Sequence, residues 1–190
     1  MQRQVKHMSK IAAIVSSPQK NANTDTLVNA AVKAAKDNGN DVEIFYLNTM
    51  TDKKGCQGCD GCKRNGAGCV IKDDLTPVLD AIRSADGVIL SSPVYFGEAC
   101  GQYRMLEDRF YGYLKADFSL NLDAGKKLAV ITAAGTAGAD ALADKIEGTM
   151  KNFFRFEPVG KLAVITGNDR KFAGNDADSM AKAAELGKKF

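Results

Sequence analysis

Short apolar runs alternate with amphipathic stretches along most of the chain. The run at 10–15 ends in Ser16-Ser17-Pro18, so it predicts a buried parallel strand that enters a loop. From Thr24 onward, apolar side chains recur at helical spacing until Gly39, which is well placed to follow the end of a helix. The first unit of the chain is therefore expected to be a strand, a loop and a helix.

The same alternation continues along the rest of the sequence. Further strands are expected at 42–47, 87–90, 127–132 and 162–165, and further helices at 74–84, 101–114, 139–153 and 176–187. Strands that alternate with helices in this way predict an α/β fold, a doubly wound parallel sheet with helices on both faces. Ligands of such sheets bind beyond the carboxyl ends of the strands, so the loops there are the first candidates for a site.

Length and composition favour one globular domain. The chain has 190 residues, of which 45% are hydrophobic and 26% charged, and both fractions are near the globular average. We expect a flexible N-terminal extension at 1–9 and a single domain at 10–190. The extension lacks the apolar core of a secretion signal, so a cytoplasmic protein is expected. No apolar run is long enough to cross a membrane, and a net charge of +3 is too small to indicate nucleic acid.

The loop after the first strand is a candidate anion site. It leads directly into a helix N-terminus, where unsatisfied amides and the helix dipole attract negative charge. Ser17, Asn23 and Thr24 offer side-chain donors, and Lys20 adds a positive charge. Neither a Walker A motif nor GxGxxG is present, which disfavours a nucleoside triphosphate or a classical dinucleotide. The alternative is a polar loop in which Asn23 or Thr24 caps the helix.

Two later loops could line a flat ring. Tyr95 and Phe96 are adjacent aromatic residues expected beyond the end of the third strand. The small residues at 133–138 would let the backbone approach a planar ligand and offer amides to its polar edge. Ordinary turn and packing chemistry is the alternative for each loop taken alone.

Four of the five cysteines lie in one loop at 53–72. They are Cys56, Cys59, Cys62 and Cys69. Two successive x2 spacings resemble those of bacterial ferredoxins, so the four thiols are candidate ligands of a 4Fe-4S cluster. Zinc is one alternative, although structural zinc sites usually draw two pairs from separated segments. Free or oxidisable thiols are the other, and Cys100 is assigned no role because a lone cysteine is more often a small buried hydrophobe.

The three loops and the cysteine run together resemble the NAD(P)H-dependent FMN reductases of flavodoxin-like fold, in their iron-sulfur flavoprotein branch. The segments that carry the resemblance are 17–24, 92–97, Asp108-Arg109 and the cysteine run followed by Asp73-Asp74. It implies the strand order 2-1-3-4-5 and non-covalent FMN. It also implies three sets of contacts: Ser17, Gln19, Lys20, Asn23 and Thr24 to the phosphate, Pro93, Val94, Tyr95, Phe96 and Gly97 to the ring, and Ala134 and Gly135 to the other edge of the ring.

The resemblance further implies an FMN-dependent oxidoreductase in which the cofactor performs the chemistry. Electrons would come from NAD(P)H or a ferredoxin-like donor, in the second case through the cluster, and would leave to an acceptor such as a flavin or quinone. The implied assembly is a homodimer or a dimer of dimers, with no nucleic acid or membrane partner. A non-enzymatic flavodoxin-like electron carrier and a cysteine-based redox sensor are the alternatives.

Overall fold

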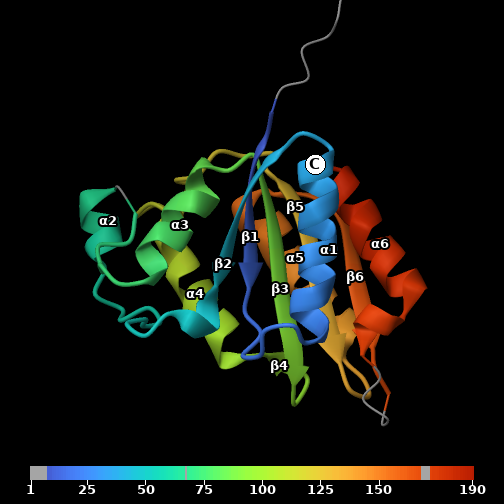
Figure 1. The fold of residues 1–190 in the computed structure, drawn as a ribbon. Coiled ribbons are helices and arrows are strands. Elements are labelled where there is room, and N and C mark those ends of the chain that lie inside the picture. Colours follow the sequence, from blue (N-terminus) through green and yellow to red (C-terminus); the bar gives the residue numbers. More distant parts are fainter. Residues whose placement is uncertain (1–7, 67, 168–171) are drawn as a thin grey trace, which may run out of the picture.

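The computed structural model describes residues 8–66, 68–167 and 172–190. At its centre lies a parallel sheet with the strand order β2-β1-β3-β5-β6, and a short strand, β4, pairs antiparallel with β3. The expected doubly wound α/β fold and its strand order are therefore confirmed (Figure 1). The strands are β1 (Lys10–Val15), β2 (Asp41–Tyr46), β3 (Gly87–Tyr95), β4 (Glu98–Ala99), β5 (Lys127–Ala134) and β6 (Glu157–Ile165).

Helices cover both faces of the sheet (Figure 1). They are α1 (Asn23–Asp37), α2 (Gly61–Asn65), α3 (Leu75–Ser84), α4 (Gly101–Arg109), α5 (Ala139–Phe154) and α6 (Ala177–Lys188). Short 3₁₀ turns lie at η1 (Leu47–Thr49), η2 (Phe110–Tyr113) and η3 (Ala173–Asn175). The helix expected at 101–114 thus ends at Arg109 and continues as the tighter turn η2.

Two hydrophobic cores lie on opposite faces of the sheet, because successive strand residues point to opposite sides. Ile11 and Ala13 of β1 pack with α1 and α6 in one core. Ala12 and Ile14, the residues between and beyond them, pack with α3, α4 and α5 in the other. The near-continuous apolar runs of the sequence are explained by this double burial.

Helices α1 and α6 approach each other closely at Gly187. A Cβ atom placed on Gly187 would lie 2.0 Å from the carbonyl oxygen of Ala31, a distance that no real side chain tolerates. Glycine at this position therefore sets the spacing between the two helices.

Strand β3 is longer than the pattern predicts. We expected the strand to end at 90, but it continues to Tyr95 and turns back into β4. Ser91 and Ser92 interrupt the apolar run, yet both are buried. The Ser91 hydroxyl donates to the carbonyl of Ile14 at 2.7 Å, so the serine is accommodated inside the sheet by a partner that its own sequence neighbourhood does not reveal.

Strand β6 also begins earlier than expected, at Glu157 and not at 162. The sequence pattern does not predict this first part of the strand, because Pro158 and Gly160 are residue types that are depleted in strands. Gly160 has φ of +152°, and the pairing between β5 and β6 shifts register near Leu128 and Ala129. The irregularity is a bulge at the start of the last strand pair.

The extension expected at 1–9 falls mostly outside the described residues. Ser9 is described, and its carbonyl accepts a hydrogen bond from the amide of Asp41 at 2.9 Å. Within the described part of the chain, no helix is both long and apolar enough to cross a bilayer.

Candidate functional site

A cleft of about 220 Å³ opens at the carboxyl edge of the sheet. It is formed where β1, β3, β5 and β6 end, as expected for a ligand of a doubly wound fold. The residues that line it are Ser17, Gln19, Ala22, Asn23, Thr24, Pro93, Val94, Tyr95, Ala133, Ala134, Gly135 and Thr166. The three loops that the sequence singles out therefore meet in one place.

The loop between β1 and α1 presents a helix N-terminus to the cleft. Helix α1 begins at Asn23, Ala22 occupies the N-cap position, and no side chain caps it. Neither Asn23 nor Thr24 is thus the cap that the sequence offered as an alternative. First-turn amides without a capping side chain remain free to bind an anion. The observation fits the phosphate of a cofactor such as FMN.

Side chains around this turn have defined orientations. The Ser17 hydroxyl accepts from the Gln19 amide at 3.3 Å, which shapes the loop. Asn23 accepts from the Ala173 amide through Oδ1 at 2.7 Å, so its Nδ2 group is the one left to donate to a ligand. Asp25 is buried and accepts from the Asn21 amide at 2.6 Å.

The end of β3 and the start of β4 form a tight hairpin, and Tyr95 of this hairpin stands at the rim of the cleft. Phe96 has φ of +54° and Gly97 has φ of +82°, so both central turn residues adopt left-handed conformations. Tyr95 lines the cleft and is 49% exposed. Burial raises the pKa of Tyr95 above its usual value, and the neighbouring Cys100 thiol adds to this effect. The phenol is therefore neutral at ordinary pH.

Gly135 leaves open space on the opposite side of the cleft. A Cβ atom placed there would meet no atom within 4 Å. A ring could approach the backbone of this turn closely, and the fit supports a planar ligand.

Three predicted contact residues do not line the cleft. Lys20 points its ammonium group over the ring of Tyr46, at 4.9 Å from the ring centre. Phe96 and Gly97 stand beyond the rim of the cleft, at the tip of the hairpin. Their contacts with a cofactor remain predictions.

Thr166 is a cleft residue that the sequence did not reveal. It follows β6, and its amide and hydroxyl both donate to the carbonyl of Ala134, at 2.9 and 3.2 Å. Its position directly after the last strand was the available signal, since the loops after the other four expected strands had all been candidate sites. Ala22 and Ala133 also line the cleft, and both belong to loops that the sequence singled out, although neither was named among the contacts to FMN.

A buried polar cluster joins two of the loops beneath the cleft. The thiol of Cys100 donates to the carbonyl of Ser16 at 3.2 Å, and the amide of Cys100 donates to the hydroxyl of Ser92 at 3.1 Å. Cys100 thus fixes the loop after β1 to the end of β3. The sequence had assigned it no role.

The cysteine loop lies between β2 and α3. Cys56 and Cys59 are exposed, Cys62 is buried in α2, and Cys69 is half-buried. All four are free thiols. Among the described residues, no three cysteine, histidine, aspartate or glutamate side chains stand together as a metal site. The ligand set proposed from the spacing stays a prediction, and a shared metal centre would require the four thiols to come closer together.

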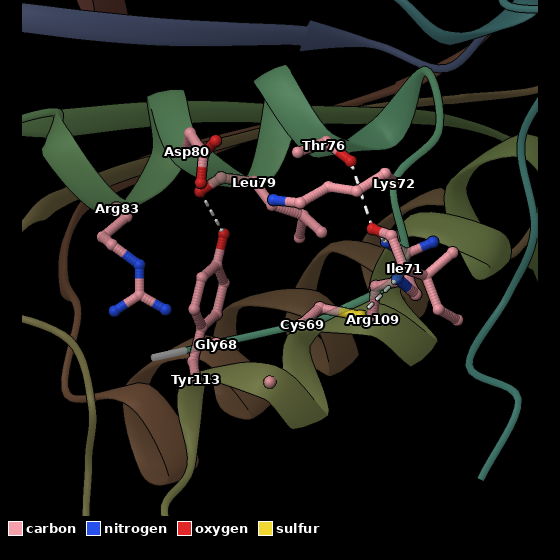
Figure 2. Close-up of a pocket in the computed structure, with 11 residues that line it drawn as sticks. Gly68, Cys69, Ile71, Lys72, Thr76, Leu79, Asp80, Arg83, Arg109 and Tyr113 are labelled. Atoms are coloured by element: carbon pink, nitrogen blue, oxygen red, sulfur yellow. Dashed lines mark hydrogen bonds between the residues drawn. The ribbon is translucent and has the colours of Figure 1, made fainter. Parts of the chain in front are cut away.

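The donor set nevertheless has the chemistry of a thiolate-ligated centre. Four free cysteines on one glycine-rich loop match the ligands that iron-sulfur clusters use. The sulfur of Cys69 already accepts a hydrogen bond, from Nε of Arg109 at 3.0 Å, as the sulfurs around clusters commonly do (Figure 2). Cys69 and Arg109 also border a small cavity of about 60 Å³ between α3 and η2.

Helix α2 is held to the body of the protein by Lys63. Its ammonium group donates to the carbonyl of Tyr111 at 2.6 Å and to that of Leu114, and lies 3.6 Å from the centre of the Tyr111 ring. These contacts attach the cysteine loop to the segment that follows α4.

A doubly wound sheet with an uncapped helix N-terminus, an aromatic rim and a small-residue turn at its carboxyl edge defines the class of flavodoxin-like flavoproteins. The chain belongs to the NADPH-dependent FMN reductase family, because the sequence model of this family matches residues 9–171.

Iron-sulfur flavoproteins are among its relatives. One from Methanocaldococcus jannaschii is 33% identical over 95% of this chain and 94% of its own length. Another, from Methanosarcina thermophila, is 32% identical over 64% of this chain and 62% of its own length. The chain is therefore a flavin-dependent oxidoreductase of the FMN reductase and iron-sulfur flavoprotein type.

Solved structures show the same fold. An NAD(P)H:quinone oxidoreductase from Methanothermobacter marburgensis superposes with a TM-score of 0.69 at 17% identity, covering 96% of this chain and 98% of the other. An azoreductase superposes with a TM-score of 0.69 at 18% identity, covering 96% of this chain and all of the other. At these identities the likeness concerns the fold alone.

Proposed function

We propose that the protein uses FMN to pass electrons between NAD(P)H or a ferredoxin-like donor and an acceptor such as a flavin or quinone. The observation that carries the proposal is the single cleft that joins an anion-binding turn, an aromatic rim and an open small-residue turn. The phosphate of FMN matches the anion-binding turn, and its planar ring matches the aromatic rim and the small-residue turn. The flexible chain of FMN would span the distance between them.

The residues of the cleft would bind and orient the cofactor. Ser17, Asn23 and Thr24, with the first amides of α1, would hold the phosphate through charge-assisted hydrogen bonds. Tyr95 would line one side of the ring, while Ala134 and Gly135 would offer backbone groups to its polar edge. When bound, FMN would supply the chemistry, accepting a hydride or single electrons at its ring.

We also propose that Cys56, Cys59, Cys62 and Cys69 hold a 4Fe-4S cluster. The names of the relatives, the spacing of the four cysteines and the hydrogen bond to the Cys69 sulfur support this assignment. A cluster would supply one-electron transfer between a protein donor and the flavin.

A homodimer or a dimer of dimers is the assembly we propose. Phe96 is fully exposed at the tip of the hairpin beside the cleft. An exposed aromatic ring at this place is typical of a protein–protein interface. Size-exclusion chromatography with light scattering should give twice or four times the chain mass, and Phe96→Ser should shift the protein toward the monomer. A monomeric wild-type protein would refute this assembly.

The function is tested by a spectrum of protein purified without oxygen, with iron and acid-labile sulfide assayed on the same sample. Flavin absorption near 450 nm with about four irons per chain would support the cluster-bearing oxidoreductase. Flavin without iron, after reconstitution with iron and sulfide, would leave a two-electron NAD(P)H reductase. No flavin after addition of FMN would refute the proposal as a whole.

The electron source is tested by anaerobic stopped-flow. Reduction of the flavin by NADPH or NADH, but not by reduced ferredoxin, would favour the two-electron route. Reduction by ferredoxin alone would favour the route through the cluster. An enzyme should then also turn over with an added acceptor, whereas an electron carrier should not.

A further inference from the structure

The buried side chain of Arg109 joins the two ends of the cysteine loop. Its Nη1 donates to the carbonyl of Lys54 at 3.0 Å and to the carboxylate of Asp73 at 2.7 Å. Nη2 donates to the carbonyl of Ile71 at 3.0 Å, and Nε donates to the sulfur of Cys69 at 3.0 Å. Only a guanidinium has enough donors in a fixed plane to make these four bonds together.

Arg109 is almost completely buried, so these bonds are shielded from water. Both side chains of the ion pair between Arg109 and Asp73 are buried, so the pair is a fixed part of the interior. Strengthened by the low local dielectric, the bonds hold the guanidinium in one orientation. The N–H that points to the Cys69 sulfur is therefore set before any metal binds.

The backbone of Cys69 is also closely packed. A Cβ atom on Gly112 would lie only 2.9 Å from the Cys69 amide nitrogen, so glycine lets this backbone pack directly on η2. Figure 2 shows the Cys69 side chain beside Arg109, above the η2 segment that carries Tyr113. By contrast, Cys56 and Cys59 are exposed on a stretch without helix or strand.

Other cations around the loop are engaged with other groups. Arg64 donates to the carbonyl of Cys59, and Lys63 donates to carbonyls after α4. Arg83 donates to the carbonyl of Asn121 and lies over the ring of Tyr113. Among the described residues, Arg109 is the cation that donates a hydrogen bond to one of the four loop sulfurs.

We propose that Arg109 is a positioning residue for the metal centre. It presets Cys69 as a fixed ligand of the centre, and its hydrogen bond withdraws negative charge from the Cys69 sulfur. Hydrogen bonds to cluster sulfurs favour the reduced state and raise the reduction potential. The inference rests on the proposed function, because it presumes that the four cysteines hold a cluster.

The test compares wild-type protein with Arg109→Lys, which keeps the charge but cannot make the four bonds together. All proteins are purified without oxygen and reconstituted with iron and sulfide. We measure FMN per chain, the rate of iron loss to a chelator, and the cluster midpoint potential by EPR-monitored titration. Arg104→Gln is the matched control, since Arg104 lies on the same helix and its side chain is exposed.

Arg109→Lys should keep FMN, lose iron at least tenfold faster than wild type, and have a more negative midpoint potential. Arg104→Gln should behave as wild type in all three measurements. A role limited to folding would change iron retention without moving the potential of the cluster that remains. Wild-type values for Arg109→Lys in both iron loss and potential would overturn the proposal.

A second measurement needs no variant at Arg109. Wild-type protein labelled with ¹⁵N-arginine is reduced, and pulsed EPR is used to look for a ¹⁵N coupling to the cluster. The coupling should be present, and should persist in labelled Arg64→Gln protein, because Arg64 is the other arginine bonded to the loop. Absence of the coupling in a protein that contains iron would overturn the inference alone. A protein that binds FMN but no iron would overturn the cluster assignment, and the inference with it.

Discussion

The guanidinium of Arg109 and the carboxylate of Asp73 form an ion pair at 2.7 Å, with side chains that are 0% and 2% exposed. Breaking a buried pair leaves one charge without its partner in a medium that solvates it poorly. Asp73→Asn should therefore lower the free energy of unfolding by about 3 to 5 kcal/mol. Chemical denaturation of the protein at pH 7 would measure this loss.

The exposed pair Lys33 and Asp37 is the control for that experiment. Asp37→Asn should change the free energy of unfolding by less than about 1 kcal/mol, because water screens the charges. Equal losses in the two variants would mean that the Asp73 pair contributes no more than a surface contact.

Thr24→Ala should weaken FMN binding while leaving the fold intact. The hydroxyl lies in the first turn of α1 at the cleft, and a hydrogen bond to a charged group contributes about 1.5 to 3 kcal/mol. The dissociation constant should rise by about 10- to 100-fold. Quenching of FMN fluorescence measures it. Thr26→Ala, on the same helix and outside the cleft lining, should bind as wild type, and a similar loss there would contradict the assignment.

Gly135→Val should block the cofactor without disturbing the apoprotein. Nothing lies within 4 Å of a Cβ atom at this position, so the side chain has room until a ring is present. We expect an unchanged melting temperature without FMN and at least a tenfold weaker affinity. Gly101→Ala, at another open glycine, should change neither value. Wild-type affinity in Gly135→Val would place the ring elsewhere.

Two helical glycines should respond to alanine in opposite directions. Gly187→Ala pushes a methyl group into the Ala31 carbonyl and should destabilise the protein by about 1 to 3 kcal/mol or more. Gly148→Ala meets only the end of the Asn152 side chain, at 4.0 Å, and should stabilise α5 by about 0.5 to 1 kcal/mol. Urea unfolding of both variants checks the signs, and loss of stability in both would contradict the difference in packing.

The start of α6 should be sensitive to acid. Asp176 accepts hydrogen bonds from the hydroxyl and the amide of Ser179, and these bonds lower the pKa of the carboxyl. The stabilisation is present above the unfolded pKa of about 3.9 and is lost as the pH falls through the lower folded pKa. Asp176→Ala should have a lower urea midpoint than wild type at pH 7, and the gap should narrow below about pH 4. A gap independent of pH would exclude the ionised cap.

The strands and the loops around the cleft could be predicted because apolar runs mark buried strands and each run ends in polar or small residues. The order of the strands was expected only from the resemblance to a known family. The start of β6 and the end of β3 could not be predicted, since Gly160 and Ser91 fit the sheet only through partners elsewhere in the chain. Thr166 was not predicted for a related reason, because its place in the cleft depends on its hydrogen bonds to Ala134 at the end of β5.

The cysteine spacing identified candidate ligands but not their arrangement. The contact between Arg109 and Cys69 joins residues 40 positions apart, and no local pattern encodes it. Asp108 directly precedes Arg109 in the sequence, whereas the acidic partner of Arg109 in the fold is Asp73. Such contacts follow from the packing of α4 against the loop, which only the folded chain defines.

The cleft is lined by residues that follow both the first and the last strand of the sheet, Ser17 and Thr166. A ligand that binds there therefore selects the fully folded chain over any partly unfolded form. At a free FMN concentration 100 times its dissociation constant, this selection would add about 2.7 kcal/mol to global stability. The flavin supply of a cell would then govern how long the protein resists proteolysis, as well as whether it can carry electrons.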